Sequence, residues 1–121
     1  MSRPVLVVDD DESIREFISV ALMDEGYAVQ TAADGAEALV SIKQERPGVI
    51  LLDMRMPIMD GWEFSRVYRA TPAPHAPIIV VTAARDAAER ASQIHADGYL
   101  SKPFELDDLL AMVGRYVREA S

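Results

Sequence analysis

The segment VILLDMRMPIMDG, Val49 to Gly61, decides how the rest of this chain is interpreted. It opens with an apolar run that is too short for a membrane span or a typical helix and is typical of a buried strand. The run ends at Asp53. Ligands of open α/β sheets bind beyond the carboxyl ends of the strands, so a carboxylate there is poorly placed for packing and well placed for chemistry.

Length and composition are those of an ordinary globular domain. The 121 residues suffice for one domain with its own core, and the absence of cysteine excludes disulfides, zinc thiolate sites and thiol catalysis. Twenty acidic against twelve basic residues give a formal charge of -8, which argues against a nucleic-acid-binding surface. No signal peptide is evident, and no apolar run approaches the roughly 18 residues of a membrane helix. We expect a cytoplasmic protein that contacts neither nucleic acid nor membrane.

Hydrophobic patterning predicts five strands that alternate with five helices. The expected strands are Pro4–Val8, Tyr27–Thr31, the run that ends at Asp53, Ile78–Val81 and Gly98–Ser101. Strands joined by helical crossovers are parallel, and right-handed crossovers give an open sheet covered on both faces. The predicted fold class is therefore α/β, with one domain over residues 1–121 and no output domain.

Two of the predicted helices have apolar faces that predict how these helices pack. In the first helix, apolar residues recur at helical spacing before a stop at Gly26; these are Ile14, Phe17, Ile18, Ala21 and Leu22. An alanine-rich helix from about Asp86 to His95 has a weaker apolar face, made of Ala87, Ala88, Ala91 and Ile94. So thin a face packs loosely, which makes this helix a candidate for a mobile surface.

Polar groups follow four of the five predicted strands: Asp9 and Asp10, Asp53, Thr82, and Lys102. In a parallel sheet they share one edge. Each alone would usually be a loop or capping residue, but all of them together are harder to explain that way. Carboxylates about 4 Å apart repel by at most roughly 4 kcal/mol per pair at an effective dielectric of 20, which calls for an opposing charge.

Lys102 and a divalent cation can supply that charge. Hard oxygen ligands without nearby His or Cys favour magnesium, which keeps several waters and leaves room for a phosphate. This set of groups suits phosphoryl transfer, in which the protein positions groups and neutralises charge. Asp53 would be the nucleophile, Lys102 a point charge on the phosphoryl group, and Thr82 a hydroxyl donor to it.

Four segments together resemble the signature of the response-regulator receiver domain of two-component signalling. They are VLVVDDDESIR, LLDMRMPIMDGWEF, VVTA and GYLSKPF, and the resemblance runs from about Pro4 to Tyr116. It implies a flavodoxin-like fold with strand order 2-1-3-4-5, of the chemotaxis-type single-domain kind. The implied metal ligands, for Mg²⁺ or for Mn²⁺ in its place, are Asp9, Asp10, Asp53 and the main-chain carbonyl of Arg55. The other implied site residues are the phosphoacceptor Asp53, the switch residues Thr82 and Tyr99, and Lys102, whose bond to Pro103 is expected to be cis.

The resemblance also implies a function. A sensor histidine kinase or phosphotransfer protein would donate a phosphoryl group to Asp53, and the change would alter the surface formed by the fourth helix, fifth strand and fifth helix. Such a domain catalyses its own phosphorylation and dephosphorylation and turns over no external substrate. The downstream target, the choice between output, relay and phosphate sink, and the choice between a monomer and a phosphorylation-dependent dimer stay open.

Three positions depart from the commonest family pattern. Arg55 and Ala84 occupy positions that the family uses to tune autodephosphorylation, and the sequence assigns no direction to their effect. His95 stands where glycine is frequent, and we interpret it as a partner of the helix dipole.

Three other functions fit the sequence less well. A magnesium-dependent phosphatase with an aspartyl nucleophile, of the haloacid dehalogenase type, needs a second acid where this chain has Arg55. A non-phosphorylated pseudo-receiver scaffold is disfavoured because Asp9, Asp10, Asp53, Thr82 and Lys102 are all intact. A flavin-binding module is weaker still, since no Ser/Thr/Gly-rich loop follows the first strand.

Overall fold

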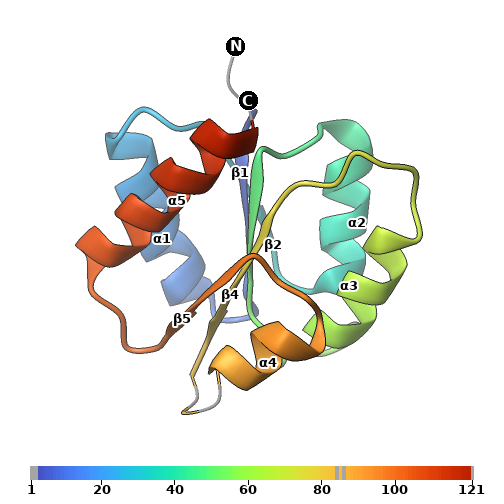
Figure 1. Cartoon of the computed structure of the whole chain (residues 1–121). Coiled ribbons are helices and arrows are strands. Elements are labelled where there is room, and N and C mark those ends of the chain that lie inside the picture. Colours follow the sequence, from blue (N-terminus) through green and yellow to red (C-terminus); the bar gives the residue numbers. More distant parts are fainter. Residues whose placement is uncertain (1–2, 84, 86, 121) are drawn as a thin grey trace.

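A computed structural model describes residues 3–83, 85 and 87–120, without the side chains of residues 118–120. Five parallel strands form one sheet in the order β2-β1-β3-β4-β5 (Figure 1), which confirms the predicted fold class and strand order. The strands are β1 Val5–Val8, β2 Val29–Ala32, β3 Val49–Leu52, β4 Ile78–Thr82 and β5 Gly98–Ser101. The helices are α1 Glu12–Asp24, α2 Gly35–Gln44, α3 Gly61–Arg69, α4 Ala87–Gln93 and α5 Leu106–Ala120.

The three central strands are buried at every residue, as expected for strands covered on both faces. Strands β1 and β3 run in register, with Val5 opposite Val49 and Val8 opposite Leu52. The next residue of each strand is an aspartate, so this register brings Asp9 and Asp53 to the same edge of the sheet. The shared edge is what sequence patterning predicted.

Side chains of alternate residues along the strands pack into two separate hydrophobic cores. One face packs under α2, α3 and α4, and its largest fully buried side chains include Leu6, Ile50 and Phe64. The other face packs under α1 and α5, through residues such as Leu51 and Leu109. Figure 1 shows α1 and α5 together on one side of the sheet and α2 with α3 on the other.

Two residues assigned to buried helix faces lie outside them. Phe17 is 54% exposed, because α1 faces the sheet through Ile18 and Leu22, and Phe17 lies about 100° around the helix from Ile18. Ala88 is exposed for the same geometric reason, since α4 packs through Ala87 and Ala91.

The ends of the helices agree with the sequence where a capping residue is present. Asp34 accepts a hydrogen bond from the backbone N–H of Glu37, as an N-cap does. Gly26 follows α1 with φ +92°, a left-handed conformation that glycine adopts at low cost. Asp86, the expected start of the fourth helix, lies outside the described residues, and α4 is seen from Ala87 to Gln93.

Among the described residues, no helix is long and apolar enough to cross a membrane.

Candidate functional site

Asp9 is held at the end of β1 by three neighbours and is only 3% exposed. Its Oδ1 accepts a hydrogen bond from the backbone N–H of Asp11 at 2.9 Å, and its Oδ2 accepts one from Lys102 Nζ at 2.7 Å. The guanidinium of Arg15 donates to the backbone carbonyl of Asp9 at 2.8 Å. The carboxylate therefore has a fixed position. Lys102, which follows the edge strand β5, points toward it.

Asp53 occupies the equivalent position after β3, where it is 7% exposed. Its backbone N–H donates to Val8 O at 2.9 Å, and its Oδ1 accepts a hydrogen bond from Met54 N–H at 2.9 Å. Its Oδ2 lies 3.7 Å from Lys102 Nζ, beyond hydrogen-bond distance. Among the described residues, no hydrogen bond reaches Oδ2, so this oxygen keeps its lone pairs for a reacting group or a metal.

Asp10 completes an acidic cluster with Asp9 and Asp53. One carboxylate oxygen from each residue lies within 4.8 Å of the other two. Asp10 is exposed whereas the other two acids are buried, so the cluster opens to solvent on its side. Three carboxylates beside one lysine leave an excess of negative charge, and an all-oxygen donor set of this kind fits Mg²⁺.

Burial raises the pKa of the Asp53 carboxyl above its ordinary value of 3.8. The neighbouring Lys102 ammonium opposes this rise, and the carboxylates of Asp9 and Asp10 add to it. The hydrogen bond from Met54 N–H favours the ionised form and so lowers the pKa. Ionising Asp53 in the folded protein therefore costs free energy, and a bound cation would reduce that cost.

The loop after Asp53 is closed by Gly61, the last residue of the opening motif. Gly61 N–H donates to Met54 O at 2.8 Å, which draws the start of α3 against the site. A Cβ at residue 61 would lie 2.8 Å from Met54 Cα and 2.9 Å from Asp53 O, closer than real Cβ contacts. Asp60 caps α3 by accepting from Glu63 N–H. The Asp-Gly pair thus fixes both the helix start and the approach to Asp53.

Thr82 and Lys102 meet at the other side of the site. Lys102 N–H donates to Thr82 O at 2.9 Å, and Thr82 is 4% exposed at the end of β4. The bond between Lys102 and Pro103 is cis, as expected. The structure therefore places all five predicted polar residues along one sheet edge and brings Asp9, Asp10, Asp53 and Lys102 into one cluster.

Tyr99 is 48% exposed on the edge strand β5. It lies opposite Val80 in the parallel register, and Val80 faces the core under α4. Because side chains alternate along a strand, Tyr99 and Thr82 are on the same face of the sheet as α4. This places the aromatic ring outward, one strand away from the buried hydroxyl.

The structure describes two of the three positions that depart from the commonest family pattern. Arg55 is exposed two residues after Asp53, and Ala84 lies outside the described residues. His95, two residues after the end of α4, adopts φ +54°, the left-handed conformation that glycine favours at helix ends. Its backbone carbonyl accepts a hydrogen bond from Arg69 Nη2 at 3.0 Å. Its partnership with the helix dipole stays a prediction.

Several contributors to the site were missed by sequence reasoning. Asp11, the third aspartate after β1, is the N-cap of α1 and accepts hydrogen bonds from the backbone N–H groups of Ser13 and Ile14. A capping residue just before a helical pattern was an available signal. No sequence signal pointed to the contact of Arg15 with Asp9, because it depends on how α1 turns against the loop.

Trp62 connects the first turn of α3 to α4, a contact that the sequence pattern did not predict. Its Nε1 donates to Gln93 Oε1 at 2.9 Å, and the Arg90 guanidinium lies 4.9 Å from the centre of its ring. Such a cation–π pair stabilises by about 0.5–1 kcal/mol at an exposed position. The first turn of α3, next to the Asp53 loop, is therefore tied directly to α4.

Comparisons with known proteins agree with this geometry. The family model described as "Response regulator receiver domain" matches residues 5–114. The chain is 43% identical over 120 residues to the response regulator MprA of Mycobacterium tuberculosis, an alignment that covers 98% of this chain and 52% of that protein. The chain thus spans about half the length of the curated relatives it matches.

Solved structures give the same result for the fold. The chemotaxis response regulator CheY4 of Vibrio cholerae is 38% identical, with a TM-score of 0.86 over 96% of this chain and 99% of that chain. A putative response regulator of Chloroflexus aurantiacus is 31% identical, with a TM-score of 0.88 over 98% of this chain and 99% of that one.

Proposed function

Since this chain belongs to the response regulator receiver domain family, we propose that it works by accepting a phosphoryl group on Asp53. The observation that carries the proposal is the setting of Asp53 Oδ2. This oxygen is 3.7 Å from Lys102 Nζ, inside a cluster of three carboxylates, and accepts no hydrogen bond from the described residues. An oxygen nucleophile with one lysine beside it and a metal-type donor set around it suits phosphoryl transfer.

Magnesium is the proposed cofactor, and Mn²⁺ can take its place. Its ligands would be carboxylate oxygens of Asp9, Asp10 and Asp53, whose clustering supports the site, and the main-chain carbonyl of Arg55. When bound, the ion would neutralise negative charge on the transferring phosphoryl group.

The proposed reaction begins with a phosphohistidine on a sensor histidine kinase or a phosphotransfer protein. Asp53 Oδ2 attacks phosphorus in line, an O–P bond forms, the P–N bond breaks, and its electron pair returns to the imidazole nitrogen. Lys102 Nζ, already between Asp9 and Asp53, would pair with a phosphoryl oxygen. The hydrogen bond from Met54 N–H to Asp53 Oδ1 keeps the carboxylate oriented during the attack.

The proposed signal starts from Thr82 and Tyr99. A phosphoryl group on Asp53 would draw the Thr82 hydroxyl inward, and Tyr99 would turn from its exposed position toward the space beside it. The equilibrium between the two arrangements would then shift, and the surface of α4, β5 and α5 would change for an unidentified downstream target. The position of both residues on the α4 face of the sheet supports this coupling.

Residues 1–121 would act as one receiver domain that phosphorylates and dephosphorylates itself and turns over no external substrate. Arg55, exposed beside the site, would affect the lifetime of the aspartyl phosphate. The chain would act as a monomer or as a phosphorylation-dependent dimer.

Incubation with MgCl₂ and acetyl phosphate, followed by intact mass measurement, tests the proposal. Wild-type protein should gain one phosphoryl group, and Asp53→Ala should gain none. Lys43→Ala, which changes a lysine far from the cluster, is the matched control and should be phosphorylated like the wild type. An unmodified wild type, or full phosphorylation of Asp53→Ala, would contradict the proposal.

A further inference from the structure

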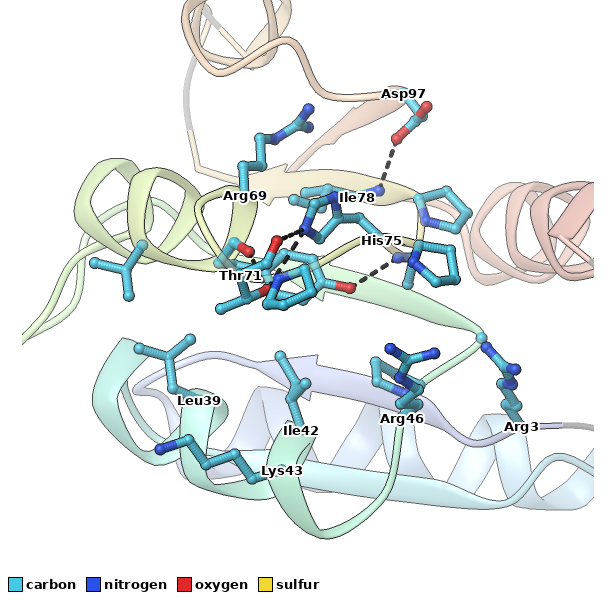
Figure 2. Close-up of a pocket in the computed structure, with 18 of the residues that line it drawn as sticks. Arg3, Leu39, Ile42, Lys43, Arg46, Arg69, Thr71, His75, Ile78 and Asp97 are labelled. Atoms are coloured by element: carbon cyan, nitrogen blue, oxygen red, sulfur yellow. Dashed lines mark hydrogen bonds between the residues drawn. The ribbon is translucent and has the colours of Figure 1, made fainter.

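A groove of about 1000 Å³ lies at the opposite end of the sheet from Asp53. Helix α2 forms one wall, and the loop from the end of α3 to β4 forms the other (Figure 2). The groove reaches the residues just before β3, β4 and β5, which are Gly48, Pro77 and Asp97. It therefore shares no residue with the phosphorylation site.

The rim of this groove is basic, although the chain as a whole carries a formal charge of -8. Four of the twelve Lys and Arg residues line it, and all four are exposed: Arg3, Lys43, Arg46 and Arg69. Asp97 is the one carboxylate among the lining residues, and its Oδ2 is occupied by a hydrogen bond from Ile78 N–H at 2.8 Å. Among the described residues, no carboxylate forms an ion pair with Arg3, Lys43 or Arg46.

Between these cations the groove is apolar. Leu39 and Ile42 of α2 face the groove from one side, and the proline-rich loop faces it from the other (Figure 2). Figure 2 shows Arg3 and Arg46 toward one end and Lys43 toward the other, while the Arg69 side chain points away from α2, where its Nη2 donates to His95 O. The cations are thus spread along the rim and do not converge on one point.

The loop wall is organised before any ligand arrives. Tyr68 OH accepts a hydrogen bond from Ala76 N–H at 2.7 Å, and His75 Nε2 lies 2.8 Å from Thr71 O. The loop also contains three prolines, each with its φ fixed by the ring. A wall that is already ordered loses little conformational entropy when a partner binds, which favours affinity.

We propose that this groove is a docking site for an acidic amphipathic peptide segment of another protein. Charge complementarity favours a segment with carboxylates toward both ends, which would meet the cations at the two ends of the rim. Its central leucine- or isoleucine-type side chains would pack on Leu39 and Ile42. A single phosphate or nucleotide phosphate would instead require donors that converge on one point, which this rim lacks.

A peptide display library tests the proposal directly. The library carries acidic residues at both ends and randomised apolar residues between them, and it is selected on the wild-type chain of residues 1–121. Selected peptides should bind the wild type with an affinity that falls as salt is raised. The double variant Lys43→Glu/Arg46→Glu should weaken binding by about tenfold or more, because like charges then face each other across the interface.

Arg66→Glu is the matched control, since it reverses an exposed charge on α3 outside the groove, and it should leave peptide binding unchanged. Ile42→Ser should weaken binding through the apolar centre, with melting curves to show that each variant is folded. Asp53→Ala should bind like the wild type, which separates this surface from phosphorylation.

Failure to enrich any peptide, or equal binding to the wild type and the double variant, would overturn the proposal. ATP and anionic phosphatidylglycerol vesicles serve as the other probes. Binding of either one with the same dependence on Lys43 and Arg46, in the absence of peptide binding, would also overturn it.

Discussion

The two lysines of this chain lie at opposite ends of the sheet and in opposite settings. At the carboxyl end, the side chain of Lys102 is 14% exposed, 2.7 Å from Asp9 and 3.7 Å from Asp53. At the amino end, Lys43 is exposed on the rim of an apolar groove, and no carboxylate in the described part of the chain pairs with it. The first charge converges with others on one point, whereas the second is one of several spread along a surface.

This difference distinguishes the proposed reaction site around Asp53 from the proposed docking surface at the groove. Interactions between charges strengthen when water is excluded, so buried groups around Asp53 can act on a single bond. Exposed charges on the groove rim are screened by salt and act mainly on the rate and specificity of encounter. The two proposed functions therefore use opposite ends of the same sheet, and variants at each end should separate them.

The largest expected effect is that of Lys102→Ala. Loss of the ammonium next to Asp53 Oδ2 should slow phosphorylation by acetyl phosphate by about a hundredfold, the cost of removing one electrostatic group from such a site. Stopped-flow or quenched time courses in MgCl₂ measure the rate. Lys43→Ala should be indistinguishable from the wild type, and equal rates for the two variants would remove the distinction between the ends of the sheet.

Magnesium should stabilise the folded protein by relieving repulsion in the acidic cluster. At a hundredfold excess over its dissociation constant the gain is about 2.7 kcal/mol, visible as a rise in melting temperature during a MgCl₂ titration. Asp10→Asn should reduce this rise, because it removes one donor from the cluster. A melting temperature that does not change over a wide range of magnesium concentrations would argue against the metal site.

Asp53→Asn should stabilise the metal-free protein at pH 7, because it removes a buried carboxylate that is costly to ionise. Burial raises the pKa of Asp53, so the folded protein binds this proton more tightly than the unfolded chain does. The contribution of Asp53 to stability is therefore full below its ordinary pKa of 3.8 and is lost as the pH rises through the folded pKa.

Thermal melts in EDTA across a pH series measure this difference. The advantage of Asp53→Asn should shrink as the pH falls below 3.8, because the carboxyl of the wild type is then increasingly protonated in both the folded and the unfolded state. A variant that is less stable than the wild type at pH 7, or whose advantage persists at low pH, would show that burial does not dominate this site.

The smallest effect is expected for Tyr99→Ala on phosphorylation itself. The ring is exposed and outside the acidic cluster, so the rate with acetyl phosphate should stay within about twofold of the wild type. The difference between phosphorylated and unphosphorylated protein in amide exchange over α4 and β5 should decrease, since the aromatic switch is gone. If exchange and rate both match the wild type, Tyr99 has only a packing role.

Sequence patterning predicted the carboxyl end of the sheet well for a physical reason. Strands β1, β3 and β4 are continuous apolar runs that end abruptly in polar residues, so the shared edge follows from the pattern. The helix stop at Gly26 was also expected from the pattern, whereas the strand order and the cis Lys102–Pro103 bond were implied by the family resemblance; all three are present.

The amino-end groove could not be predicted in this way. Arg3, Lys43, Arg46 and Arg69 are scattered through the sequence, and only the packing of α2 opposite the proline-rich loop brings them to one rim. The exposure of Phe17 was missed for a related reason, because apolar spacing shows a helix but not how far the helix turns about its axis. The contact between Arg15 and Asp9 depends on that same rotation.

The central claim is that the phosphoryl group is carried by Asp53 and by no other carboxylate of the cluster. Its most direct test is to phosphorylate the wild type with acetyl phosphate and magnesium, reduce the acyl phosphate with borohydride, and sequence the peptides by mass spectrometry. Reduction converts a phosphorylated aspartate to homoserine. We predict homoserine at residue 53 alone; homoserine at residue 9 or 10, or an unreduced Asp53 in protein that carries phosphate, would contradict the account.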